Sequence, residues 1–178
     1  MKKIYHYIKT IVKRLRYSGA EYAKSMGVQV GEDSRILTTN FGSEPWLISI
    51  GNKVTITSGV KLLTHDGAAW LIEDEKGRRE HFARVTIGNN VFIGINSIVM
   101  PGVVIEDNVI VAAGSVVTKS VPNGLIVGGN PVKIIGKFED YKKKALESFV
   151  SRKEMDFSLS FKERVDKVID TNPKKYLQ

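Results

Sequence analysis

The chain has 178 residues, which predicts one domain with appendages, and its hydrophobic and charged fractions of 42% and 26% suit a packed core. It contains no cysteine, which excludes a disulfide framework, a thiolate zinc site and a cysteine nucleophile. The formal charge of +8 lies at the ends, because residues 1–18 carry +6, residues 19–136 carry −1 and residues 137–178 carry +3. A nucleic-acid protein usually carries positive charge on its functional domain, so we expect no nucleic-acid partner.

Residues 1–27 form a predicted helical segment. Apolar side chains recur with helical spacing from Ile4 to Leu15, and a second short helix is predicted over residues 20–25, before Gly27. The apolar stripe and positive charge of residues 1–18 suit weak contact with an anionic membrane surface; alternatively, the stripe packs against protein and the charges are solvated. We find no pattern of a cleavable signal or of a membrane span, so we expect a cytoplasmic protein.

The central segment, residues 28–137, is dominated by a six-residue repeat. Aliphatic residues recur at every sixth position, and Val or Ser follows each of them four positions later. The clearest run of the first set is Ile87, Ile93, Val99, Ile105, Val111 and Val117, and the second set is Val91, Ser97, Val103, Val109, Ser115 and Val121. This period fits short strands joined by tight corners. Three strands make a triangular turn of about 18 residues, and such turns stack into a parallel β-helix.

One segment breaks the repeat. Residues 67–84 (GAAWLIEDEKGRREHFAR) are polar and out of phase, which predicts a loop thrown out from one corner before the repeat resumes at Val85. Long loops inside compact repeats are usually functional. The loop contains His81, which is either a contact to substrate or a solvated residue. It also contains Trp70, which is either a stacking surface for a sugar ring or an anchor for the loop.

The segment from residue 138 to residue 178 is again predicted to be helical. Residues from Tyr141 to Phe149 share one helical stripe, and Ser160 with Glu163 forms a capping box that opens a last helix through Ile169. Helices at both ends would cover the open coils of the β-helix, whose strand edges otherwise lack partners.

Two motifs, AAGSVVTK and GGNPVK, are more specific than the hexapeptides alone. Through them, and over about residues 20–137, the chain resembles the hexapeptide-repeat acetyltransferases, in particular the maltose and galactoside acetyltransferases and the capsular-polysaccharide O-acetyltransferases. The resemblance implies an all-β core that is a left-handed parallel β-helix, and a homotrimer with active sites between subunits. It also implies acetyl-CoA as co-substrate and a hydroxyl of a sugar or polysaccharide precursor as the acetyl acceptor.

The family places a single histidine before the long loop as general base, and His65, in LLTHDG, stands at that position. The resemblance therefore implies that His65 takes the proton of the acceptor hydroxyl as its oxygen attacks the thioester. Asp66 adjoins it and has two interpretations. The carboxylate orients the imidazole, or it caps the corner, because successive side chains of a strand point to opposite faces.

The positions that match the family's coenzyme contacts are Phe92, Gly94, Ile95, Ala113, Thr118, Lys119 and Lys133. Phe92 stands where the family usually has tryptophan, and the backbone N–H of Ile95 corresponds to the donor that faces the thioester oxygen. Ala113 matches the small residue against which the pantetheine arm lies. Lys119 and Lys133 either offer charge near the coenzyme's phosphates or are ordinary solvated surface.

Three rival interpretations remain on sequence grounds. A zinc enzyme similar to the γ-class carbonic anhydrases needs three converging histidines, but the chain has only three, and His6 lies outside the repeats, so we expect no metal. A β-helix can also serve as a non-catalytic scaffold. Within the enzyme class, the acceptor is alternatively the amine of an amino sugar or another small molecule.

Overall fold

The computed structural model describes residues 19–174, so the first predicted helix and its expected membrane contact lie outside the described residues. The chain divides into two compact units, one ending at Glu139 and one beginning at Asp140. Within residues 19–174, no helix has the length and apolar character that crossing a membrane requires. The division into segments at residues 27 and 137 stays a prediction.

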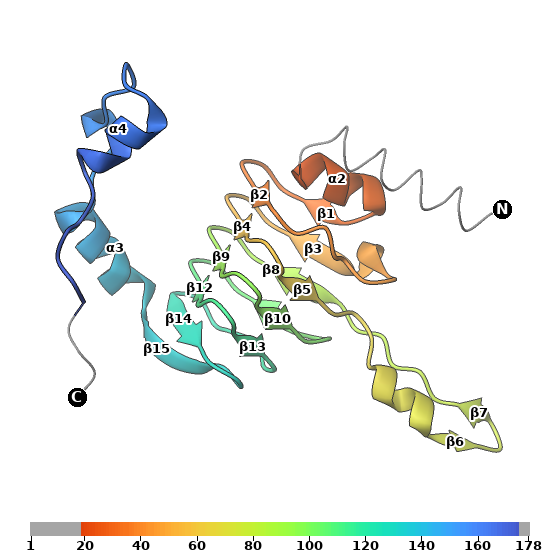
Figure 1. Ribbon diagram of the computed structural model, residues 1–178. Helices are drawn as coiled ribbons and strands as arrows, with labels where there is room; N and C mark the ends of the chain where they lie inside the picture. The colour runs from red at the N-terminus through yellow and green to blue at the C-terminus, as the bar shows by residue number, and fades with distance from the viewer. Residues whose placement is uncertain (1–18, 175–178) are drawn as a thin grey trace. The chain divides into compact units, whose positions relative to one another are not determined.

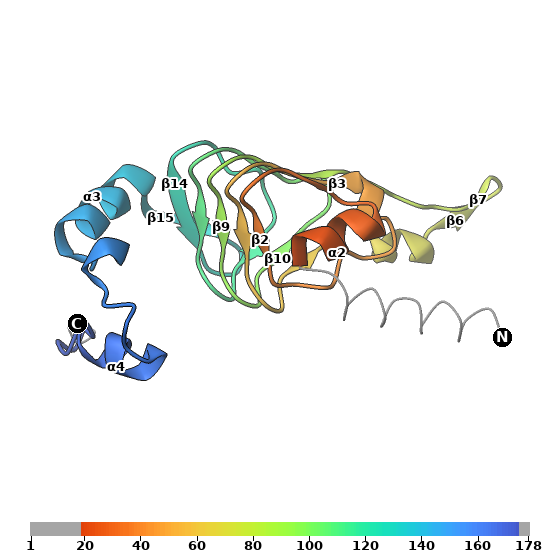
Figure 2. The same cartoon turned by 90° about the horizontal axis from the view of Figure 1, so that it is seen from above.

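The first unit consists of short, mostly parallel strands that stack into coils, each strand following its predecessor around a corner (Figures 1 and 2). The first sheet contains β1 (Gln29–Val30), β3 (Ile48–Ile50), β8 (Val85–Ile87) and β11 (Val104–Ile105). The second contains β2 (Arg35–Ile36), β4 (Thr55–Ile56), β9 (Phe92–Ile93), β12 (Ile110–Val111), β14 (Leu125–Gly128) and β15 (Lys133–Lys137). The third contains β5 (Lys61–Leu62), β10 (Ile98–Val99) and β13 (Val116–Val117).

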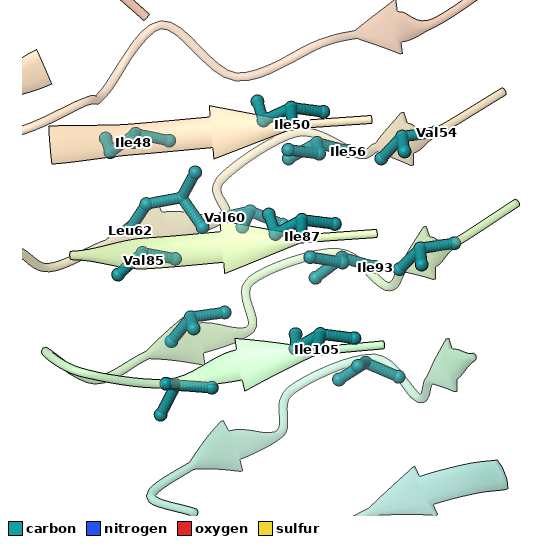
Figure 3. Close-up of a cluster of buried hydrophobic side chains, with 14 of the residues drawn as sticks. Ile48, Ile50, Val54, Ile56, Val60, Leu62, Val85, Ile87, Ile93 and Ile105 are labelled. Atoms are coloured by element: carbon teal, nitrogen blue, oxygen red, sulfur yellow. The ribbon is translucent and has the colours of Figure 1, made fainter. Parts of the chain in front are cut away.

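The six-residue repeat places both of its residue sets inside the coils. Every member of the two sets from Ile87 to Val121 is at most 3% exposed. Figure 3 shows how Ile50, Ile87 and Ile105 of successive coils lie one above the other. Burying each such side chain contributes about 1.5–3 kcal/mol relative to leaving it exposed. The predicted β-helical repeat is therefore the core of this unit.

Serine is tolerated at two of these inward positions because its hydroxyl finds a backbone partner. Ser97 Oγ donates to the carbonyl oxygen of Ala112 at 3.0 Å, and Ser115 Oγ donates to the same oxygen at 2.6 Å. Both serines are fully buried. A buried hydroxyl without such a partner would be costly, so these bonds explain why Ser alternates with Val in the repeat.

The two ends of the coil stack are built differently. The helix α2 (Gly19–Met26) packs against β1 and β2 and buries Tyr22 and Ala23, which confirms the short helix predicted there. At the other end, β14 is parallel to β12 while β15 turns back antiparallel to β14. The GGNPVK motif is thus the turn of a hairpin that returns along the last coil.

Two insertions interrupt the regular spacing of the coils. Between Val85 and Val117, neighbouring coils are 18 residues apart, whereas the last coil is shorter, because Ile110 pairs with Ile126. The first two coils are 20 residues apart, and the extra residues fall in the segment that ends with η1 (Pro45–Leu47). The next two are 37 residues apart, because residues 67–84 leave the coil. We call these residues the arm; they contain η2 (Gly67–Leu71) and a hairpin of β6 (Glu73–Asp74) and β7 (Gly77–Arg78), which extends away from the coils in Figure 1.

The second unit is helical, as predicted, and contains most of α3 (Phe138–Ser148), η3 (Arg152–Glu154) and α4 (Phe161–Asp166). The rings of Tyr141 and Phe149 are 5.9 Å apart. Ser160 and Glu163 form the predicted capping box. The helix α4 ends before Ile169, since the N–H of Val168 bonds three residues back and tightens the last turn.

Candidate active site

His65 lies where the chain leaves β5 and enters the arm. At the base of the arm, His65 forms an antiparallel bridge with Phe82. The N–H of Asp66 donates to the carbonyl oxygen of His81 at 3.0 Å. This short ladder fixes the backbone of His65, while its side chain remains 44% exposed. The histidine is thus held firmly at a place that a substrate can reach.

Glu44 contacts the imidazole. Its Oε2 lies 2.8 Å from Nδ1 of His65 and also accepts a hydrogen bond from the hydroxyl of Thr64 at 2.7 Å. The Glu44 side chain is 14% exposed, and Thr64 is buried. Desolvation raises the pKa of Glu44, but the hydrogen bonds from His65 and Thr64 outweigh it and hold that pKa below its ordinary value. Glu44 is therefore an anion at neutral pH and accepts the Nδ1 proton of the ring.

Glu44 was not predicted from the sequence. It lies 21 residues before His65, in the irregular segment of the first coil where the two-residue insertion breaks the six-residue phase. Without a repeat phase, the distance of this carboxylate from the histidine could not be predicted. The only sequence signal was the break itself, one coil before the candidate base.

Asp66 takes the second of its two predicted roles in the structure. Its Oδ1 accepts a hydrogen bond from the N–H of Ala68 at 2.9 Å and caps η2. The carboxylate that contacts the imidazole comes from Glu44 instead. Asp66 therefore orders the start of the arm. The arm in turn holds the residues that face His65.

A pocket of about 370 Å³ opens beside His65. It is lined by Ser43, Glu44, His65, Asp66, Gly67, Trp70, Arg78, Arg79, Glu80, His81 and Phe82. The ring of Phe82 meets the imidazole edge-on, with centroids 6.1 Å apart. The pocket thus combines a base, paired charges and aromatic walls, as small-molecule sites commonly do.

The predicted coenzyme positions are distributed over two edges of the coil. The arm edge comprises the turns between the third and first sheets, at residues 63–84, 100–103 and 118–121, and it contains His65, Asp66, Thr118 and Lys119. The alanine edge comprises the turns between the second and third sheets, at residues 57–60, 94–97 and 112–115, and it contains Gly94, Ile95 and Ala113. Phe92 and Lys133 lie on strands of the second sheet. One chain therefore does not gather all of these residues around His65.

At the alanine edge, adjacent coils approach closely. A Cβ at Gly94 would lie 2.4 Å from the backbone nitrogen of Ala113, so this position requires glycine. The carbonyl oxygen of Ile95 accepts from the N–H of Gly114 at 2.8 Å. The N–H of Ile95 has no hydrogen-bond partner within residues 19–174, which leaves this donor available to a ligand. Ala113 itself is exposed, so its methyl group faces outward.

Lys119 and Lys133 line the same groove. This groove of about 130 Å³ lies between the last coil and the β15 strand. Two ammonium groups at one groove suit an anionic group such as a phosphate. Among residues 19–174, no three side chains of the kinds that bind metals gather into a possible metal site.

The chain is similar in sequence to known bacterial transferases. Residues 84–119 match the family described as bacterial transferase hexapeptide (six repeats). The chain is 49% identical to Protein CapG of Staphylococcus aureus over 138 residues, which cover 76% of this chain and 80% of CapG. It is 35% identical to the galactoside O-acetyltransferase of Escherichia coli K12 over 100 residues, covering 56% of this chain and 49% of that protein.

A solved structure agrees with these similarities. The hexapeptide-repeat acetyltransferase of Vibrio cholerae in complex with acetyl coenzyme A matches with a TM-score of 0.53 and 26% identity, covering 63% of this chain and 61% of that chain. The extent of the similarity to CapG, together with the hexapeptide match and the acetyltransferase relatives, shows that the chain belongs to the bacterial hexapeptide-repeat transferase family and is an acyltransferase.

Proposed function

We propose that this protein transfers the acetyl group of acetyl-CoA to a hydroxyl of a sugar or polysaccharide precursor, with His65 as general base. The observation that carries the proposal is the contact between His65 Nδ1 and Glu44 Oε2 at the wall of the pocket. The relatives supply the donor and acceptor classes, because one is solved with acetyl coenzyme A and another acts on galactosides.

The contact with Glu44 determines which ring nitrogen reacts. A carboxylate that accepts from Nδ1–H leaves Nε2 of the neutral imidazole without a proton, so Nε2 is the basic atom. Nε2 takes the proton of the acceptor hydroxyl while that oxygen bonds to the thioester carbonyl carbon. The resulting imidazolium is stabilised by the adjacent Glu44 anion.

The collapse of the tetrahedral intermediate completes the transfer. The C–S bond breaks, the new C–O ester bond remains, and His65 returns its proton to the departing thiolate, which leaves as coenzyme A. The acetyl group passes directly from coenzyme A to the acceptor. An acyl-enzyme intermediate on cysteine is excluded, because the chain has no cysteine. The free N–H of Ile95 is the proposed donor to the oxyanion, an interaction typically worth about 10²–10³ in rate.

The coenzyme is proposed to lie along the alanine edge. Ala113 leaves room for the pantetheine arm, Phe92 lies on the adjoining strand, and the groove of Lys119 and Lys133 offers positive charge to phosphates. Because His65 lies on the arm edge, this assignment requires a neighbouring subunit to bring its own edge to it. The family resemblance, which implies a left-handed coil and a homotrimer, supports such an arrangement.

Two finer points belong to the same proposal. An amine of an amino sugar is the alternative acceptor, because the same base can take a proton from an ammonium group before the resulting amine attacks, or from the amine as it attacks. The cysteine-free composition supports a reducing compartment, so we propose a cytoplasmic enzyme.

Replacing the base tests the assignment. We expect His65→Ala to keep its fold and its acetyl-CoA affinity but to lower turnover by at least about 10²-fold, the scale of general-base catalysis. Released coenzyme A can be measured with a thiol reagent, and the protein adds no background because it contains no cysteine. Mild alkali distinguishes the two products, because it cleaves an acetyl ester and leaves an acetamide intact. Near-normal turnover of His65→Ala would contradict the role of His65.

A further inference from the structure

Trp70 is the largest side chain that the arm presents to the pocket. It belongs to η2, whose start is capped by Asp66, and it lines the same pocket as His65. Its side chain is nevertheless 62% exposed. Burial against its own chain therefore does not explain Trp70, and it does not anchor the arm to its own coil. A large aromatic ring that stays exposed beside a candidate base suits contact with a ligand.

The indole is held in place by the opposite strand of the arm. The guanidinium carbon of Arg78, on β7, lies 5.6 Å from the centre of the Trp70 ring. The N–H of Arg79 donates to the carbonyl oxygen of Ile72 at 2.9 Å and joins the two sides of the arm. The ring is therefore ordered before any ligand arrives, which reduces the entropic cost of binding.

The charges of this wall compensate one another. Arg78 pairs with Glu80 at 3.3 Å, and Arg79 pairs with Asp74. In a pocket that binds a phosphate or a carboxylate, we would expect an arginine without a carboxylate partner, so that its charge can pair with the ligand. The wall thus offers an aromatic face with little net charge, which matches a ring that is apolar on one side and carries neutral hydroxyl groups at its rim.

We propose that Trp70 is the platform of the acceptor site and that the apolar face of a neutral pyranose ring stacks on its indole, with a hydroxyl of that ring directed to His65. This inference rests on the proposed function, and it assigns the acceptor chemistry: a neutral sugar ring bound by the arm, rather than an anionic sugar or an acyclic alcohol.

Steady-state kinetics with methyl β-galactoside as the acceptor tests the platform. We expect Trp70→Ala to lower kcat/KM for the sugar by about tenfold or more, the effect of losing one aromatic contact, and to leave the KM for acetyl-CoA unchanged. Trp70→Phe keeps a ring and should recover most of the loss. Leu71→Ala is the matched control, because Leu71 follows Trp70 in η2, is 75% exposed and is not among the residues that line the pocket. An unchanged kcat/KM in Trp70→Ala would refute the platform.

A binding measurement separates this inference from the proposed function. The chain has two tryptophans, so in Trp46→Phe the remaining indole emission comes from Trp70 alone. We expect methyl β-galactoside to change that emission in a saturable way, and methyl β-galacturonide, which adds a carboxylate to the same ring, to require a higher concentration. Saturable change without acetylation would uphold the platform and contradict the O-acetyltransferase proposal. Acetylation without any change in emission, or tighter binding of the galacturonide, would overturn the platform as stated.

Discussion

At His65, the chemistry depends on which of two neighbouring carboxylates contacts the ring. Asp66 is adjacent in sequence but caps η2, whereas Glu44 reaches Nδ1 from a different coil. Thr64 contributes by donating to the same Glu44 oxygen, which leaves that carboxylate little freedom to turn away. The imidazole is thus oriented by a group that is fixed on two sides.

We expect Glu44→Gln to lower kcat by about 10- to 100-fold while leaving the KM for acetyl-CoA nearly unchanged, because it removes the negative charge beside the imidazolium but not the base. Asp66→Asn should have a smaller effect on kcat, since Asp66 acts on the arm and not on the ring. Glu75→Gln, at the tip of the arm and away from the pocket, is the control of equal charge change. Equal losses in the Glu44 and Asp66 variants would contradict the orienting role of Glu44.

The lowered pKa of Glu44 also predicts a dependence of stability on pH. Because folding lowers this pKa below the ordinary 4.5, the ionised carboxylate stabilises the folded state above that value, and this contribution is lost as the pH falls through the lowered pKa. Urea unfolding of the wild type and of Glu44→Gln should therefore show a difference in free energy of unfolding that shrinks as the pH falls below about 4.5. A difference that stays constant or grows in this acidic range would show that folding does not lower the pKa of Glu44.

Of the residues at the candidate site, some could be predicted from the sequence and others could not. The role of His65 was predicted through the family resemblance, which places a general base before the loop that breaks the repeat. Glu44 was not, because a hydrogen bond across 21 residues is predictable only when the intervening coil keeps its phase, and the first coil gains two residues. Ile95 lies between these cases: its position was predicted, and its free N–H is a property of the folded backbone.

At the scale of elements, the strict six-residue phase from Ile87 to Val121 predicted both the strands and the inward side chains. Each inward residue packs on its counterpart in the next coil, so a single phase determines the whole stack. The hairpin of β14 and β15 was not predicted, because the last coil departs from the six-residue phase and β15 then returns antiparallel, which no repeat specifies. The arm was predicted as an excursion, but its internal hairpin depends on the pairing of Glu73 with Arg78, which no repeat specifies.

The alanine edge is proposed to hold the pantetheine arm of the coenzyme, and a bulky side chain there tests this. We expect Ala113→Tyr to fold normally, because this side chain is exposed, and to lose acetyl-CoA affinity by at least about tenfold, because the ring would fill the space of the pantetheine arm. Calorimetric titration with acetyl-CoA measures the affinity, and circular dichroism checks the fold. Ala113→Ser adds only one oxygen atom and should bind nearly as the wild type does. Unchanged affinity in a folded Ala113→Tyr protein would remove the coenzyme from this edge.

For the whole molecule, the decisive feature is that His65 lies on the arm edge, whereas Ile95 and Ala113, the proposed contacts of the thioester and the pantetheine arm, lie on the alanine edge. A coil with three sheets has three edges, so one subunit can present its arm edge to a neighbour and its alanine edge to another neighbour. A closed ring of three such contacts uses both edges of every subunit and leaves neither exposed, which is the property of a cyclic homotrimer. The proposed homotrimer would accommodate this distribution of the site, and it is what the family resemblance implies.

Mixed trimers test this arrangement. His65→Ala lacks the base on its arm edge, Ala113→Tyr lacks the groove on its alanine edge, and each homotrimer should be nearly inactive. Equal amounts of the two variants are unfolded and refolded together, which gives roughly three quarters mixed trimers. If every site joins the arm edge of one subunit to the alanine edge of the next, each mixed trimer has one intact site of three. We therefore expect about a quarter of wild-type turnover. Sedimentation establishes that the refolded species are trimers. If the site lies within one subunit, no mixture contains an intact site, and turnover stays at the level of the separate variants.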